Sequence, residues 1–410
     1  MKHFLGFVLL SLSAFNTWSL NTLKMVSKDP VKLEKIDTSS FTNCFFIACD
    51  YALDNLNKKT IIPDSLAITS IQLVYTQYRT SSAFNQQKLN NNRLLKLFKL
   101  YPNLANKITW EFDLIEQTGA KSKTEGMSYF HGFIISYRPP VTAESFEEEK
   151  KYLQQVIKNI DDKKLDYTIK TSWNDTFGYQ YDTVWTEVKP PEPPKNYYQP
   201  DLFQSKDVIT VLDSINLNKS IIVCDVTGSM SPYIQQVIKF IKTSTNRKEV
   251  MGYVFFNDGD KKKSKNKKVL KTGGIYIANN NNEEEVLNVL NQTMINGDGG
   301  GEGIENDIEA IIEGIKTFPE CEQVILIADN LEFLRDRAYI AEVAKPVHTI
   351  ICTQHTVINP DYLDLAKATN GSIWIKGNHL KDFQLITNQN SVVFLNHVYT
   401  LNNNKFYIEF

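Results

Sequence analysis

The second half of the chain alternates between two hydrophobic patterns. Continuous apolar runs such as 221–224 predict strands that are covered on both faces. Between the runs, apolar residues recur at helical spacing, as in Ile234, Val237, Ile238 and Ile241. The predicted strands are 221–224, 250–256, 274–277, 324–328, 347–352 and 372–375, and the predicted helices are 231–241, 283–294, 304–315 and 359–371. Because strands and helices alternate, we expect an α/β fold with a doubly wound, mostly parallel sheet and helices on both faces.

The first half has a different pattern, which predicts a separate N-terminal α+β domain over residues 30–188. Its elements do not alternate regularly: the predicted helices are 94–100 and 143–160, and the predicted strands are 108–114 and 130–137. Prolines concentrated within 189–200 are typical of a stiff linker. The α/β domain is assigned to 207–390. The last segment, 391–410, predicts a β-hairpin, because apolar stretches flank three consecutive asparagines.

Residues 1–19 have the features of a secretory signal peptide. Lys2 precedes an apolar run that ends at Phe15, and the small residues Thr17 and Ser19 fit the positions before a cleavage site. An uncleaved N-terminal anchor is the alternative. No later stretch approaches the roughly 18 apolar residues of a transmembrane helix. We therefore expect an exported bacterial protein, periplasmic or at the cell surface, with no transmembrane segment after removal of the signal and with association to the envelope as an option.

The net charge, the cysteine count and a lysine-rich segment each bear on the expected partners and bonds of the chain. A net charge of −2 gives no reason to expect a nucleic-acid partner. The cysteine count is five, so at least one thiol stays unpaired in a monomer, and the sequence leaves open whether Cys44 and Cys49 pair. Seven lysines in the segment 261–271 predict a solvated turn, with contact to an acidic partner as the alternative.

Candidate metal ligands follow two of the predicted strands. Asp225 comes directly after 221–224, and Asp329 comes directly after 324–328. In open α/β sheets, ligands bind beyond the carboxyl ends of the strands. Thr227 and Ser229 add two hydroxyls in the turn that Asp225 begins. Carboxylates and hydroxyls suit a hard cation such as Mg²⁺.

These residues carry a resemblance to a known family. Asp225-x-Thr227-x-Ser229 resembles the DxSxS signature of von Willebrand factor A (VWA) domains, and the apolar strand ending at Asp329 is similar to a second motif of that family. The Gly-rich segment 297–305 resembles a GGGDxPE variant of the third VWA loop, with Glu302 in the place of its Asp and Asp298 near the place of a Thr.

The resemblance covers about 207–390 and implies a VWA-like fold with a metal-ion-dependent adhesion site. The metal it implies is Mg²⁺, with Ca²⁺ or Mn²⁺ as alternatives. Two extra acids would weaken the attraction of the metal for a ligand carboxylate or favour Ca²⁺.

A VWA-like fold without a metal, in which Asp225 only caps a helix, is the other interpretation. The metal ligands implied are Asp225, Thr227, Ser229, Asp298, Glu302 and Asp329. The whole chain is also similar to an uncharacterised exported group of Bacteroidetes-type proteins.

The function that these features predict is non-enzymatic binding of a protein partner through a carboxylate on the metal. One alternative is an envelope assembly scaffold that needs no metal. The other is an enzyme in the N-terminal half, in which His131 activates Cys44 or Cys49. A buried structural histidine is the simpler interpretation of His131, and no hydrolase, zinc-protease or nucleotide-binding motif supports catalysis.

Overall fold

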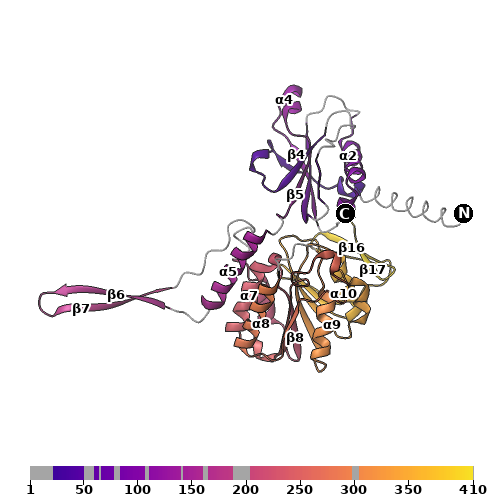
Figure 1. The fold of residues 1–410 in the computed structure, drawn as a ribbon. Helices are drawn as coiled ribbons and strands as arrows, with labels where there is room; N and C mark the ends of the chain where they lie inside the picture. The colour runs from indigo at the N-terminus through magenta and orange to yellow at the C-terminus, as the bar shows by residue number, and fades with distance from the viewer. Residues whose placement is uncertain are drawn as a thin grey trace.

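A computed structural model describes residues 22–49, 60–63, 66–77, 84–106, 110–139, 142–159, 165–187, 204–297 and 304–409. Within these ranges the strands form sheets of seven, five, three and two strands. Figure 1 shows the five-stranded sheet above the seven-stranded one, with the two-stranded ribbon projecting to the side. None of the helices in the described part of the chain is long and apolar enough to span a membrane.

The seven-stranded sheet confirms the predicted mixed architecture. Its strands are β8 (Ser220–Asp225), β9 (Val250–Phe256), β10 (Ile275–Ala278), β11 (Gln323–Asp329), β12 (Val347–Cys352), β13 (Ser372–Ile375) and β14 (Asn378–Leu380). They lie in the order β10-β9-β8-β11-β12-β13-β14. The five inner strands are parallel, and the edge strands β10 and β14 are antiparallel to their neighbours.

Helices cover both faces of this sheet. On one face lie α6 (Asp207–Ser214), α7 (Ser231–Thr243) and α8 (Glu283–Asn296), and on the other lie α9 (Asp307–Thr317) and α10 (Pro360–Thr369). The side chains of β8 show why its sequence is apolar throughout. Ile221 and Val223 enter the core beneath α9 and α10, whereas Ile222 and Cys224 enter the core beneath α7 and α8. A strand buried on both faces has no place for a solvated side chain.

The dipeptide Ser231-Pro232 is typical of a helix start in which the serine hydroxyl caps the helix. In the structure Ser231 is already the first residue of α7, directly after the short 3₁₀ turn η3 (Gly228–Met230). Its hydroxyl instead donates to a carboxylate oxygen of Glu149 at 3.2 Å. The capping prediction for Ser231 is wrong by one residue, because the turn after β8 continues directly into the helix.

The C-terminal segment forms the three-stranded antiparallel sheet of β15 (Ser391–Phe394), β16 (His397–Asn402) and β17 (Lys405–Glu409). The expected hairpin corresponds to β16 and β17. A tight turn with positive φ at Leu395 and Asn396 splits the first predicted stretch and adds β15. The backbone N–H of Phe406 donates to Asp364 of α10 at 2.7 Å, which fastens this sheet to the larger core.

The five-stranded sheet consists of β1 (Val31–Leu33), β2 (Cys44–Ala48), β3 (Ile68–Thr76), β4 (Glu111–Gln117) and β5 (Gly132–Tyr137), in the order β1-β4-β3-β5-β2. The helices α2 (Gln86–Leu100) and α3 (Pro102–Asn106) cover one face. The sequence predicted β4, β5 and the end of α2. It did not predict β1 or β2, which are only three and five residues long, or β3, where polar and apolar residues mix. The shorter elements are α4 (Lys123–Ser128), η1 (Thr38–Ser40), η4 (Asn246–Glu249), η5 (Ser264–Asn266), η6 (Arg337–Glu342) and η7 (Phe383–Leu385).

The helix α5 (Ala143–Asn159) belongs to the core of the larger sheet, although it precedes the proline-rich segment. Tyr152, Leu153 and Val156 are buried together with residues of α7 and α8. The Tyr152 hydroxyl also donates to the Gln235 side chain at 2.6 Å. The apolar face expected for the helix 143–160 therefore crosses the predicted domain boundary.

The ribbon of β6 (Leu165–Asn174) and β7 (Gly178–Glu187) exposes aromatic side chains near its turn. Trp173 pairs with Tyr179 across the ribbon, and their rings meet edge to face at 4.9 Å between centroids.

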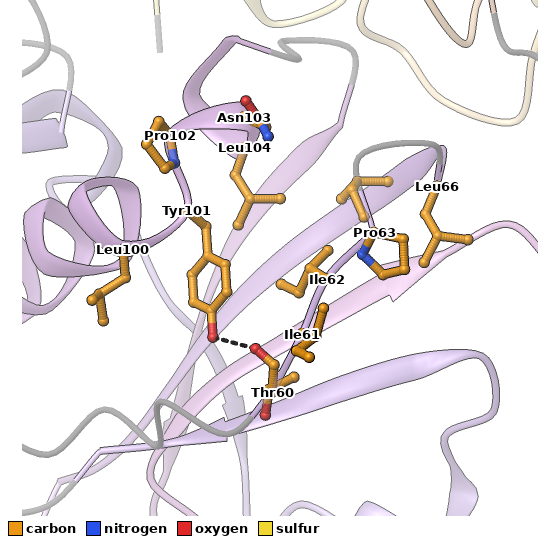
Figure 2. A pocket seen from close by; sticks show the side chains of 11 residues that line it. Thr60, Ile61, Ile62, Pro63, Leu66, Leu100, Tyr101, Pro102, Asn103 and Leu104 are labelled. Atoms are coloured by element: carbon orange, nitrogen blue, oxygen red, sulfur yellow. Dashed lines mark hydrogen bonds between the residues drawn. The ribbon is translucent and has the colours of Figure 1, made fainter.

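A cavity of about 300 Å³ lies beside α2 and α3, as Figure 2 shows. The Tyr101 hydroxyl reaches across it to the Thr60 carbonyl at 2.8 Å. The described residues that line it are mostly apolar and include no acidic or basic side chain.

Replacing Gly371 tests the packing of α10 against the sheet. A Cβ at Gly371 would lie 1.7 Å from the Val347 carbonyl oxygen, so backbone must move. We expect Gly371→Ala to lower the free energy of unfolding by about 2–3 kcal/mol in a denaturant titration. Gly377→Ala is the matched control: its added Cβ meets no atom within 4 Å, and its positive φ alone should cost about 1 kcal/mol. Equal losses for the two variants would contradict the close approach.

Candidate metal centre

The candidate centre lies where the strand order reverses. β8 is the first strand of the seven-stranded sheet in the chain, and β9 and β11 pair with it on opposite sides. Chain connections from adjacent strands leave in opposite directions at such a point, which opens a crevice at the carboxyl ends. Asp225 is the last residue of β8, and Asp329 is the last residue of β11.

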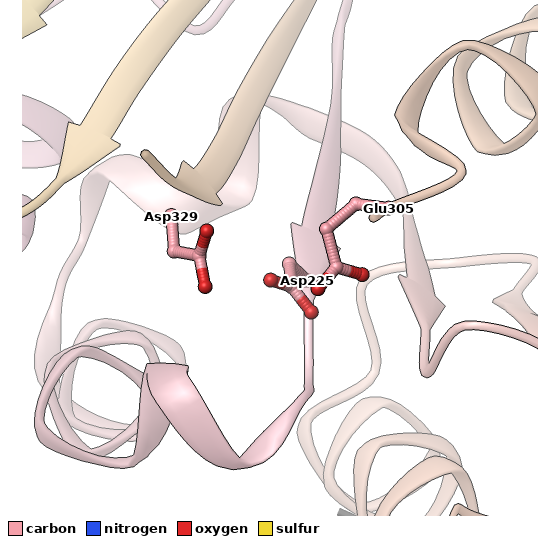
Figure 3. Close-up of side chains that lie close together, drawn as sticks. All are labelled: Asp225, Glu305 and Asp329. Atoms are coloured by element: carbon pink, nitrogen blue, oxygen red, sulfur yellow. The ribbon is translucent and has the colours of Figure 1, made fainter. Parts of the chain in front are cut away.

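A third carboxylate joins these two. Glu305 lies just before α9 and points toward Asp225 and Asp329, as Figure 3 shows. One carboxylate oxygen from each residue lies within 4.8 Å of the other two. Asp225, Glu305 and Asp329 are 0%, 4% and 5% exposed, so water screens the repulsion between their charges only weakly.

Two hydroxyls complete one side of the cluster. The Thr227 backbone N–H donates to Asp225 Oδ1 at 2.7 Å, and the Thr227 hydroxyl donates to Asp225 Oδ2 at 3.0 Å. The hydroxyl oxygens of Thr227 and Ser229 are 2.9 Å apart. The two hydrogen bonds from Thr227 therefore hold the Asp225 carboxylate in position. The hydroxyls of Thr227 and Ser229 add two neutral oxygens beside it.

In the described part of the chain, no basic side chain is among the main causes of the pKa shifts of Asp225 and Glu305. Burial and then the charge of Asp329 raise the pKa of Asp225 well above its usual value. Burial and then the charge of Asp225 do the same to the pKa of Glu305 and to that of the buried Asp307. One oxygen of Glu305 and one of Asp307 are buried without any hydrogen-bond partner in the described part of the chain. Buried polar atoms without a partner are costly and rare.

Asp258 shows the contrasting arrangement in the same region. It is fully buried, but Lys267 Nζ lies 2.6 Å from its carboxylate and Arg335 lies at 3.5 Å. Lys267 comes from the lysine-rich segment that the sequence assigned to a solvated turn. That assignment misses Lys267, whose side chain is 4% exposed and serves this ion pair.

A hard divalent cation fits the donor set of the cluster. Three carboxylates and two hydroxyls converge from three loops, and oxygen is the donor that Mg²⁺, Ca²⁺ and Mn²⁺ prefer. A cation at the cluster would neutralise the repulsion and satisfy the partnerless oxygen of Glu305.

The structure brings together four of the six residues that the sequence nominates. Asp225, Thr227, Ser229 and Asp329 lie side by side, whereas Asp298 and Glu302 fall outside the described residues. Sequence reasoning missed Glu305. The available signal was its position at the end of the Gly-rich segment 297–305, immediately before a helix.

The two N-terminal cysteine candidates differ in their position relative to His131. Cys44 and Cys49 form no disulfide. The Cys49 backbone N–H donates to the His131 carbonyl at 2.8 Å, whereas Cys44 pairs with Ser136 at the other end of β5. Burial raises the pKa of Cys44, and a nucleophilic thiol needs the opposite shift. Burial followed by the charge of Arg93 lowers the pKa of His131.

Removing one charge from the cluster should stabilise the protein when metal is absent. In a chelating buffer, we expect Glu305→Gln to raise the free energy of unfolding by about 1–3 kcal/mol, because like charges in a poorly solvated site repel each other. Asp258→Asn should act in the opposite direction and cost about 3–5 kcal/mol, since it leaves Lys267 and Arg335 uncompensated. Denaturant titration of both variants measures whether the free energy of unfolding rises in the first and falls in the second. A loss of stability in Glu305→Gln would show that the cluster is already compensated.

A comparison with protein-family models and a comparison with curated proteins both end without a match to this chain.

Proposed function

We propose that residues 207–390 form a VWA-like domain that binds a divalent metal and presents it to a carboxylate ligand. The observation that carries this proposal is the buried acid cluster at the reversal point of the sheet. The strand order around β8, with an antiparallel strand β10 at one edge, supports the same assignment. The five-stranded sheet belongs to a separate N-terminal unit in this proposal, with α5 docked onto the VWA-like domain.

Five side chains would hold the metal. Asp225, Glu305 and Asp329 supply carboxylates, and Thr227 and Ser229 supply hydroxyls. The bound metal supplies Lewis acidity for an oxygen ligand. Mg²⁺ is the preferred ion, with Ca²⁺ or Mn²⁺ as alternatives.

The third carboxylate affects the strength of ligand binding. Three negative charges surround a cation that carries two positive ones. Such a metal attracts a ligand carboxylate less strongly than a metal held by two acids. A ligand therefore needs further contacts outside the metal in order to bind tightly. The sequence led to the same expectation of weak ligand binding through Asp298 and Glu302. In the structure, Glu305 is the additional acid of the cluster on which this expectation now rests.

The role we propose for the whole chain is that of an exported binding protein without enzymatic activity. The signal-like segment 1–19, which lies outside the described residues, supports export. The raised pKa of Cys44 gives no support to Cys44 as a thiol nucleophile.

Metal titration of the full chain tests the proposal. We expect saturable binding of Mg²⁺, Ca²⁺ or Mn²⁺ in calorimetry, together with a gain in stability of roughly 2.7 kcal/mol when the metal is at a hundred times its dissociation constant. Asp225→Asn should lose both effects. Asp364→Asn is the control, because Asp364 is a partly buried acid of the same half that bonds to Phe406 and lies outside the cluster. A folded wild type that binds none of the three ions would contradict the proposal.

A further inference from the structure

A cavity of about 350 Å³ lies between the carboxyl edge of the seven-stranded sheet and the five-stranded sheet. Ser229 and Asp329 of the acid cluster line one side of it. Ser70 of β3 and Ser136 of β5 line the other side. One side of the candidate metal centre therefore borders a cavity that the N-terminal half of the chain helps to form.

Contacts on two sides hold the five-stranded sheet in this place. At the start of β4, Glu111 accepts the Thr356 backbone N–H at 2.9 Å and lies 3.4 Å from His355 Nδ1. The hydrogen bond from His355 is the main cause that lowers the pKa of Glu111 to about 2. On the other side, α5 follows β5 after a short connection and packs against α7 through Tyr152. These contacts hold in place the wall of the cavity that the five-stranded sheet supplies.

The lining has the chemistry of a site for a small polar ligand. Hydroxyl groups come from both sides, and each can donate or accept a hydrogen bond. Arg138 and His355 add nitrogen donors at the wall. The volume lies at the lower end of the range for small-molecule sites, about 300–1,000 Å³. The serine and threonine residues are Thr69, Ser70, Ser136, Ser229 and Thr353, and Tyr137 and Tyr233 also line the cavity.

We propose that this cavity takes a small carboxylic acid with further hydrogen-bonding groups, such as a hydroxy acid or an amino acid. Its carboxylate binds the metal held by the acid cluster, and Ser70 and Ser136 bind the remainder of the molecule. The inference rests on the proposed metal site and specifies its ligand. The contacts from β3 and β5 supply the affinity that a metal surrounded by three acids does not supply alone.

The position of β3 and β5 beside the cavity also favours a small ligand over a flat protein surface. Ser70 and Ser136 line the same cavity as Asp329, and the contacts of Glu111 and α5 hold this wall in place. A small free acid needs no displacement of this wall. In this arrangement, side chains of the five-stranded sheet determine which acid binds, and side chains at the edge of the seven-stranded sheet hold the metal.

Calorimetry on the full chain saturated with Mg²⁺ tests this inference with acetate, lactate and glutamate as probes. We expect lactate or glutamate to bind saturably and more tightly than acetate. Ser136→Leu and Ser70→Leu each place a larger apolar side chain at the cavity and should weaken that binding by about tenfold or more, while Mg²⁺ affinity stays unchanged. Ser172→Leu is the matched control, since Ser172 is an exposed strand serine of β6.

The outcomes separate this inference from the proposed function. Binding of Mg²⁺ without binding of any of the three acids overturns the small-acid assignment alone, as does unchanged acid binding in both cavity variants. A failure to bind Mg²⁺ overturns the metal site and this inference with it. A blocked tripeptide with a central glutamate distinguishes a free acid from an acidic side chain. Tighter binding of the tripeptide than of free glutamate contradicts a small free ligand.

Discussion

Repulsion among buried carboxylates at the ends of β8 and β11 is the constraint around which this fold is arranged. Parallel strands bring their carboxyl ends to one edge, so acids that follow two adjacent strands must meet. Asp225 and Asp329 are placed in this way by the sheet, and Glu305 is added by the loop before α9. The N-termini of α7 and α9 lie next to these loops, and their dipoles offset a part of the negative charge. What remains uncompensated among the described residues is the physical basis of the cation site that we propose.

The neighbouring Asp258 shows how differently the same side chain can be used. Its charge is balanced within the chain by Lys267 and Arg335, so it needs no ligand. The acid cluster has no comparable cation among its described neighbours. Sequence alone does not distinguish these two cases, because Lys267 is 9 residues from Asp258 and Arg335 is 77 residues away. Only the fold decides which acids are paired and which are left to repel each other.

The parts of the structure that sequence could predict are those governed by local pattern. The inner strands of the large sheet are continuous apolar runs, and Asp225 and Asp329 follow them directly, so both the sheet and these two residues were accessible. Glu305 was harder to find, because it lies before α9 and not at the end of a strand, so its distance from Asp225 and Asp329 depends on the tertiary fold. β2 and β3 were missed for different reasons: β2 is an apolar run of only five residues, and β3 mixes polar and apolar residues without strict alternation. Asp298 and Glu302 stay predictions, since they lie outside the described residues.

The position of α5 in the chain has a consequence for the order of synthesis. Tyr152, Leu153 and Val156 leave the ribosome well before α7 and α8, whose side chains bury them. Domains generally fold as they emerge, N-terminal parts first. The apolar face of α5 must therefore wait, exposed, until more than a hundred further residues have been made. During synthesis, α5 therefore cannot reach its native packing before the later half has been made, even when the N-terminal sheet has already formed.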